Sequence, residues 1–195
     1  MGEDEGRSAD GRRRRSESSR DKIVEAMLAL VAEGQITPSA EQVAGRASVG
    51  LRSVFRHFKD MESLYAAMTA RLARNYEMWL VPYTSNEWRG QLSETTERRL
   101  STYEKLMPFK RAADAHRHES ATIQAEHART LAFMRAKLKS ILPEEIAGDA
   151  LTFEAIDLLL SFETWQRLRM DQKLSARKAE AVVRAQVDRL AEPRQ

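Results

Sequence analysis

The chain has 195 residues, enough for one sizeable core or for a small module joined to a larger domain. Cysteine is absent, which excludes thiol nucleophiles, thiolate metal sites and disulfides. The formal net charge of +3 is too small to identify a polyanionic partner, so the distribution of charge is more informative than its sum.

Composition favours an all-α protein, because Ala, Leu, Arg, Glu and Gln dominate and β-branched residues are sparse. The first five residues are mostly acidic, and no stretch approaches the about 18 apolar residues that a membrane span requires. We therefore expect a soluble, cytoplasmic protein with no membrane partner.

Residues 1–17 are polar and charged and show no apolar periodicity, which predicts a disordered arm in the absence of a partner. A dense basic run, Arg12–Arg15, lies just before the first helical pattern. Such an arm could reach DNA phosphates or a minor groove. A solvated tail without a binding role is the alternative.

Residues 18–60 show the pattern of three short helices. The first helix is expected to begin after a cap at Ser18 or Ser19 and to stop at Gly34, which can adopt a left-handed conformation. Its apolar residues recur at three- and four-residue spacing: Ile23, Ala26, Met27, Leu30 and Val31.

A capping box predicts the start of the second helix, since Ser39 stands three positions before Gln42. The turn at residues 48–50 ends that helix, and residues 51–58 form a third one. Two short helices joined by a tight, Gly-containing turn are typical of a helix-turn-helix module, whose last helix enters the major groove of DNA.

The third helix is expected to have two different faces. At about 100° per residue, Val54 and Phe58 share one side and dock on the other helices, whereas Arg52 and Arg56 point away from them. Paired exposed arginines suit bidentate recognition of guanine O6 and N7, each contributing about 1–3 kcal/mol of discrimination. Arg52 and Arg56 are therefore the predicted base readers.

Residues beside these arginines are expected to fix the position of the helix on DNA. Ser53 and His57 can donate to phosphate oxygens on one side, and Leu51 and Phe55 lie on the other. The helix N-terminus at Ser39 adds free N–H groups and the positive end of a dipole. An ordinary solvent-facing helix surface is the alternative interpretation.

The stretch from Ile23 to Tyr65, and especially residues 47–64, resembles the DNA-binding domain of TetR-family transcriptional regulators. That family's usual pattern has Ala-Gly-Val-Ser at the turn, Thr-Leu-Tyr in the recognition helix, His-Phe at its end and Lys-Glu opening the fourth helix. The residues at the corresponding places here are Ser53, Val54, Phe55, His57, Phe58 and Glu62.

Four positions depart from that pattern. Gly50 replaces the usual capping Ser, and Ser48 replaces the turn Gly, so Ser48 is expected to adopt a left-handed conformation at some energetic cost. Phe55 lacks the hydroxyl of the usual Tyr, and Met61 stands where a Lys commonly touches phosphate.

Those two phosphate contacts are therefore not carried over, and Arg56, Lys59 or the Arg12–Arg15 arm could compensate. The predicted contacts to double-stranded DNA are Ser39, Gly50, Leu51, Arg52, Ser53, Phe55, Arg56, His57 and Lys59.

Residues 61–195 are expected to form a helical bundle for effector binding and dimerisation. The pattern predicts a helix capped by Asp60 that continues toward Leu80, followed by helices over 92–107, 112–142 and 144–170, and a last helix capped by Ser175.

The resemblance implies that the last two helices pack with those of a second copy as a four-helix dimer interface. The 144–170 segment has more apolar surface than one narrow seam would bury, which agrees with this, although a central core helix is the alternative. The candidate interface residues are Leu151, Leu158, Leu159, Phe162, Val183, Val187 and Leu190.

The resemblance also implies a small-molecule effector held in a cavity of the C-terminal domain. Aromatic and Met side chains could surround an apolar ligand, although plain core packing is the alternative for each of them. The candidates are Trp79, Tyr83, Trp88, Tyr103, Phe109, Phe133, Met134, Phe153 and Trp165.

A metal site, a cofactor and catalytic residues are not expected. His116, His118, Glu119 and His127 form the one suggestive group, but His116 and His118 lie about 200° apart on a helix and cannot share a metal. There is no Ser-His-Asp pattern, no glycine-rich phosphate loop and no His-Glu helix signature, so an enzyme has no support.

Taken together, these features predict a homodimeric transcriptional regulator that binds a palindromic operator, and a repressor that a small-molecule effector releases. The alternative is an all-helical protein-binding or scaffolding protein that does not bind DNA.

Overall fold

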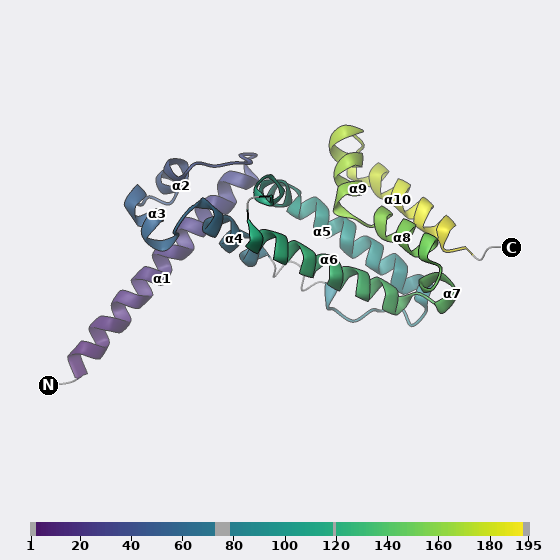
Figure 1. Ribbon diagram of the computed structural model, residues 1–195, viewed down its shortest axis with the longest axis horizontal. Coiled ribbons are helices and arrows are strands. Elements are labelled where there is room, and N and C mark those ends of the chain that lie inside the picture. The colour runs from purple at the N-terminus through teal and green to yellow at the C-terminus, as the bar shows by residue number, and fades with distance from the viewer. Residues whose placement is uncertain (1–2, 73–78, 119, 193–195) are drawn as a thin grey trace. The chain divides into compact units, whose positions relative to one another are not determined.

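The computed structural model describes residues 3–72, 79–118 and 120–192. All regular structure in these ranges is helical (Figure 1), which confirms the all-α prediction. In chain order the helices are α1 Glu3–Ala32, α2 Ala40–Arg46, α3 Leu51–His57, α4 Met61–Leu72, α5 Trp88–His116, α6 Ala121–Ile141, α7 Glu144–Ala147, α8 Ala150–Leu159, α9 Phe162–Gln166, the π-helical η2 Arg167–Asp171 and α10 Ala176–Leu190.

The chain divides into two compact units. The first comprises α1 to α4 together with Pro108–Gln124, and it therefore takes in more of the chain than the predicted module of residues 18–60. The second comprises the described residues of Ala73–Met107 and Ala125–Gln195.

The core of the first unit is built chiefly from the apolar stripes of α1 to α4. The stripe expected on α1 is buried there. The principal members of this core are Ile23, Met27, Val31, Val43, Val54, Phe58, Leu64, Tyr65 and Met68.

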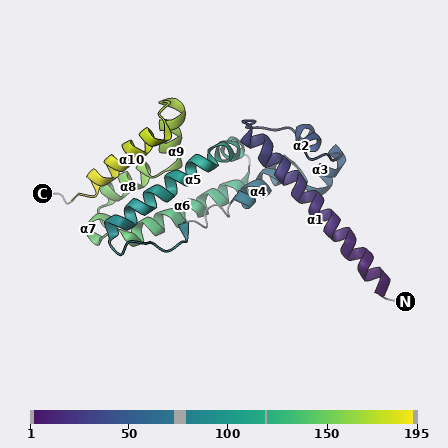
Figure 2. The same ribbon diagram turned by 180° about the vertical axis from the view of Figure 1, so that it is seen from behind.

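Helix α1 begins at Glu3, whereas the sequence pattern predicted disorder up to residue 17. Residues 3–17 contain no proline and several strong helix formers, so nothing breaks the helix N-terminal to its buried stripe. The run Arg12–Arg15 thus has a helical backbone, and this half of α1 extends beyond α2 to α4 in both views (Figures 1 and 2). At the other end, Gly34 has φ +97°, as predicted for a left-handed stop.

Helix α4 begins after the predicted cap, because Asp60 Oδ1 accepts a 2.8 Å hydrogen bond from the Ser63 N–H. Its described part ends at Leu72. The predicted continuation toward Leu80 falls partly on residues 73–78, which lie outside the described ranges.

The prediction that a helix ends before Pro108 was wrong, because Pro108 lies inside α5. The break comes instead between His116 and Ala121, so the helix predicted over 112–142 is two helices. Ser120 explains the new start: its Oγ accepts a hydrogen bond from the Ile123 N–H at 3.2 Å and caps α6.

The single helix predicted over 144–170 is also broken, into α7, α8, α9 and η2. Asp149 caps α8 by accepting from the Leu151 N–H at 3.1 Å, and Ser161 caps α9 by accepting from the Thr164 N–H at 3.1 Å. Such local bonds compete with continuation of a helix. Ser175 caps α10 as predicted.

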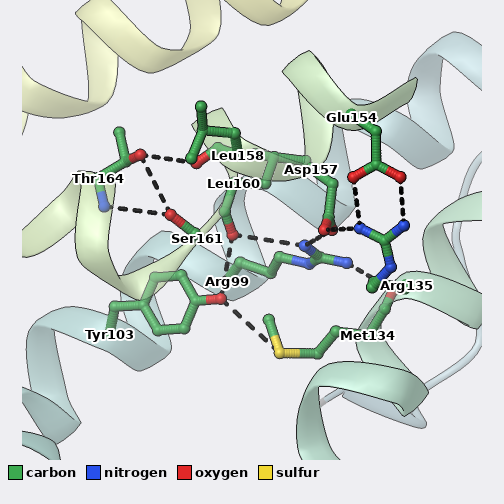
Figure 3. A network of polar contacts seen from close by, with 10 residues as sticks. All are labelled: Arg99, Tyr103, Met134, Arg135, Glu154, Asp157, Leu158, Leu160, Ser161 and Thr164. Atoms are coloured by element: carbon green, nitrogen blue, oxygen red, sulfur yellow. Dashed lines mark hydrogen bonds and ion pairs between the residues drawn. The ribbon is translucent and has the colours of Figure 1, made fainter. Parts of the chain in front are cut away.

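A polar network holds the break between α8 and α9 (Figure 3). The carbonyl oxygen of Leu160 accepts from the Tyr103 hydroxyl at 3.0 Å and from Arg99 Nη1 at 3.4 Å. Arg135 donates to Asp157 at 2.7 Å and also pairs with Glu154. The carbonyl freed by the break is thus satisfied inside the unit.

The core of the second unit draws on every helix from α5 to α10, and α8 and α10 lie side by side in both views (Figures 1 and 2). Trp79 and Trp165 are buried in this core, and Trp88 packs at its edge. Other buried members are Tyr103, Leu138, Ile156, Leu160 and Val183.

Candidate nucleic-acid interface

The start of α2 has the predicted capping box. Ser39 Oγ accepts from the Gln42 N–H at 3.3 Å, and the Gln42 side chain accepts from the Ser39 N–H at 2.8 Å. Both side chains are exposed, so this end of α2 is open to solvent.

The turn between α2 and α3 also has its expected geometry. Ser48 has φ +54°, which confirms the left-handed conformation predicted for it. The Val49 N–H closes the turn by donating to the Ala44 carbonyl at 3.0 Å. Gly50 then caps α3 through its extended backbone, with φ −70° and ψ 147°, and makes no side-chain cap. A left-handed residue that carries a Cβ costs about 1–2 kcal/mol, so the core contacts of α3 must outweigh it.

One face of α3 is buried as predicted. Val54 on α3 is 1% exposed, and Phe58, which follows the helix with an extended backbone rather than inside it as predicted, is 3% exposed; both belong to the core of the first unit. Because α3 has only seven residues, these two side chains set which way the rest of the helix faces.

The opposite face carries two arginines. Arg52 and Arg56 are both exposed and, at a spacing of four residues, lie one above the other on the helix. Neither guanidinium group forms an ion pair with a residue that the structure describes. Their ten N–H donors, five on each, remain available to a partner.

His57 differs from its expected role as a phosphate donor. Its Nε2 atom is buried and has no hydrogen-bond partner among the described residues. Burial and then the charges of Arg56 and Arg20 lower the pKa of the imidazole below its ordinary value of 6.5, which favours the neutral ring at pH 7. A phosphate contact through Nε2 would require the ring to turn.

The remaining predicted contacts lie at the surface around α3. Ser53 is half-buried, and the other predicted residues are exposed: Ser39, Gly50, Leu51, Phe55 and Lys59. All of them belong to α2, α3, the turn or the residue after α3, so the structure brings the predicted set together in one unit.

Sequence reasoning missed Arg20, which lies over the ring of Phe58 at 4.8 Å from the centroid. The two residues are far apart along the chain, and no local pattern signals their contact. Arg20 adds a further positive charge at the C-terminal end of α3.

The predicted effector residues divide into three groups. Trp79, Tyr83, Phe133 and Met134 line a cavity of ≈260 Å³, counting space open to solvent. Tyr103, Phe153 and Trp165 are buried in the core of the second unit, and Trp88 packs at its edge. Phe109 packs on the core of the first unit, so its inclusion in this pocket was wrong.

The residues predicted for the dimer interface differ in their exposure. Phe162, Val183 and Val187 are buried in the core of their own chain, so they do not form an outer surface. Leu151 is 78% exposed and Leu158 is 65% exposed, both on α8, and Val182 on α10 is also exposed. Leu159 and Leu190 are half-buried.

His116 stacks on the ring of Tyr65, with ring centroids 4.0 Å apart. Burial raises the pKa of the Tyr65 phenol to about 12.

Glu119, a member of the histidine group considered as a metal site, lies outside the described residues. In the ranges that the structure covers, no group of three or more His, Asp or Glu side chains could hold a metal ion. Nor is any helix in those ranges long and apolar enough to cross a membrane.

No protein-family model and no curated protein matches this sequence. Solved structures do resemble it. A TetR transcription regulator from Haloarcula marismortui has a TM-score of 0.69 and 14% identity, covering 90% of this chain and 97% of that one. NalD of Pseudomonas aeruginosa, the secondary repressor of the MexAB-OprM multidrug efflux pump, has a TM-score of 0.53 and 16% identity, covering 89% and 96%.

The multidrug binding protein EbrR, solved with imidazole, has a TM-score of 0.57 and 17% identity, covering 90% of each chain. The chain therefore has the fold of TetR transcription regulators.

Proposed function

We propose that this chain, which shares its fold with TetR transcription regulators, is itself a TetR-family regulator that binds DNA at specific sequences. It acts as a homodimeric repressor on a palindromic operator, and a small-molecule effector releases it. The observation that carries the proposal is the division of residues 51–58 into a buried side with Val54 and Phe58 and an exposed side with Arg52 and Arg56.

On this proposal the two arginines read base edges in the major groove, each by a bidentate contact to guanine. Ser39, Ser53 and Lys59 supply contacts to the phosphate backbone, which fix the register of α3 without reading sequence. The absence of ion-pair partners for Arg52 and Arg56 among the described residues supports this assignment, because no internal contact has to break.

Dimerisation is supported by the exposed leucines of α8. Leu151 and Leu158 are large apolar side chains left in water, and Val182 on the neighbouring α10 adds to them. Contiguous exposed apolar residues mark interaction surfaces. An effector releases DNA only if it binds more tightly to the conformation that does not fit the operator. A tenfold decrease in DNA affinity needs about 1.4 kcal/mol of that preference.

The experiment is selection of bound duplexes from a random pool with the full-length protein. A palindromic consensus would establish DNA binding, symmetry and half-site spacing together. Binding of the selected duplex should then weaken steeply as salt increases, because phosphate contacts release counterions.

The rival function is a protein-binding module, and the exposed Leu51 and Phe55 on α3 favour it over a purely polar surface. Enrichment of no sequence would overturn DNA recognition and leave that rival.

A further inference from the structure

The exposed side of α3 carries two rows of side chains, and only one of them is charged. Arg52 and Arg56 form the first row, and both are exposed. Leu51 and Phe55 form the second row: Leu51 is 38% exposed and Phe55 is 48% exposed. Because residues four apart lie one above the other on a helix, the two rows run side by side along α3. An apolar row thus borders a row of guanidinium groups.

The fold makes little use of the apolar row. Neither Leu51 nor Phe55 belongs to the core that the described residues of the first unit form. The ring of Phe55 has no stacking or cation–π partner among those residues, whereas Arg20 covers the ring of Phe58. Adjacent large apolar side chains that are left in water mark a contact surface.

The chemistry of the apolar row limits what it can bind. The side chains of Leu51 and Phe55 have no polar atom, so they cannot bond to a phosphate oxygen or to a polar atom of a base edge. The apolar group that a base pair presents in the major groove is the 5-methyl group of thymine, and Phe is a side chain that contacts it. The apolar row therefore matches thymine, as the charged row matches guanine.

Both rows have the same reach along a DNA groove. The members of a row are four residues apart, which is about 6 Å along the helix axis and close to two base-pair steps. A short helix that lies along the major groove brings both rows over the same few base pairs. Thymine and guanine contacts are thus expected within one half-site.

The charged row decides which partner suits the apolar one. Arg52 and Arg56 form no ion pair with a described residue, so a partner that covers Leu51 and Phe55 also meets two positive charges. An apolar protein surface would bury those charges without compensation, whereas the DNA backbone supplies negative charge beside the methyl groups.

We propose that Leu51 and Phe55 read thymine methyl groups in the operator half-site, beside the guanines that Arg52 and Arg56 contact. The inference rests on the proposed DNA-binding function and adds a second, apolar element to its sequence recognition. It also gives the exposed apolar side chains of α3 a role that needs no protein partner.

The experiment replaces thymine by deoxyuridine in the selected duplex, one position at a time. Uracil lacks only the 5-methyl group, so base pairing and the polar base edge are unchanged. Competition binding with the full-length protein compares the two duplexes. At a contacted position, each methyl group removed should weaken binding by about three- to fivefold, because burial of an apolar group in the contact is lost.

Variants of the apolar row test whether it causes this loss. Protein that carries both Leu51→Ala and Phe55→Ala should bind the thymine and uracil duplexes alike, and its fold should survive because both side chains are exposed. Phe55→Leu should keep part of the preference. Leu131→Ala, at an exposed leucine of α6, is the matched control and should keep the wild-type ratio. Arg52→Ala should bind both duplexes more weakly and keep their ratio.

Equal binding of thymine and uracil duplexes at every position would overturn the inference and leave DNA recognition standing. A uracil penalty that persists in the double variant would come from the shape of the duplex and would also refute methyl reading. A selected consensus without thymine in its half-sites would do the same. Enrichment of no sequence at all would overturn the proposed function and the inference together.

Discussion

The guanidinium group of Arg20 lies over the ring of Phe58, 4.8 Å from its centroid. Arg20 belongs to α1 and Phe58 follows the last residue of α3, so this cation–π contact joins the first helix to the end of the third. At an exposed site it contributes about 0.5–1 kcal/mol. The short α3 is thus held both by its buried face and at its C-terminal end.

Replacing either exposed arginine of α3 should reduce discrimination between sequences. Arg52→Ala and Arg56→Ala each remove a bidentate base contact, so each should cost about 1–3 kcal/mol on the selected duplex and less on scrambled DNA. Competition binding with both duplexes measures this. Arg177→Ala, at an exposed position of α10, is the control and should change neither. Equal losses on both duplexes would contradict base reading.

Shortening Val54 should loosen the whole recognition helix. Val54→Ala leaves a cavity at a fully buried position, and we expect about 1–3 kcal/mol lower stability and weaker binding to every duplex. Urea unfolding followed by circular dichroism gives the stability. Phe55→Ala, on the exposed side of α3, should stay within about 0.5 kcal/mol of wild type. A Val54 variant as stable as wild type would show that α3 does not depend on this contact.

Glycine at the turn should stabilise the protein. Ser48 has φ +54°, where a Cβ is unfavourable, so Ser48→Gly should gain about 0.5–1 kcal/mol despite the greater freedom of its unfolded chain. Thermal unfolding is the measurement. Gly34→Ala tests the same reasoning in reverse, because Gly34 has φ +97° and should lose stability when substituted. Shifts of the same sign in both variants would refute the argument.

The carboxylate of Glu104 should make stability depend on acid pH. It accepts from Arg169 at 2.9 and 2.7 Å and from Trp165 Nε1 at 3.0 Å, and chiefly the Arg169 bond lowers its pKa below the ordinary 4.5. A lowered pKa in the folded state means that this stabilisation is present above the unfolded value and is lost as pH falls through the folded one.

Glu104→Gln should therefore melt at a lower temperature at neutral pH and show a flatter pH profile below 4.5. Melting curves between about pH 3 and pH 7 test it. Glu145→Gln, at an exposed site on α7, should retain the wild-type profile. A Glu104 variant with the wild-type slope would exclude this carboxylate as a source of the acid dependence.

Charge on the outer face of α8 should prevent dimerisation. Leu151→Arg and Leu158→Arg change side chains that the folded chain leaves exposed, so the fold should survive while association is lost. Sedimentation velocity distinguishes monomer from dimer. Leu131→Arg, an exposed leucine on α6, is the matched control. A dimer that persists in both α8 variants would place the interface elsewhere.

Local signals predicted the recognition module well. The capping box at Ser39, the left-handed Ser48 and the cap at Asp60 each depend on residues within a few positions, and all three are present. The helical period alone also placed Val54 inside and Arg52 outside. The division of this module into faces was therefore readable from sequence.

The C-terminal half was less predictable because competing signals overlap there. The apolar run 158–160 suggested an unbroken helix, although Ser161 caps the next one and the carbonyl of Leu160 pairs with Tyr103 from a distant helix. Val183 has the same apolar character whether it faces its own core or a partner. Only the packed chain decides between those roles.

All three tryptophans of the chain, Trp79, Trp88 and Trp165, belong to the second unit. Tryptophan fluorescence therefore comes from the second unit, which contains the aromatic cavity, and the unit with α3 contributes none. A change in the tryptophan fluorescence spectrum on adding duplex alone would show that DNA binding at α3 changes the surroundings of residues in the second unit.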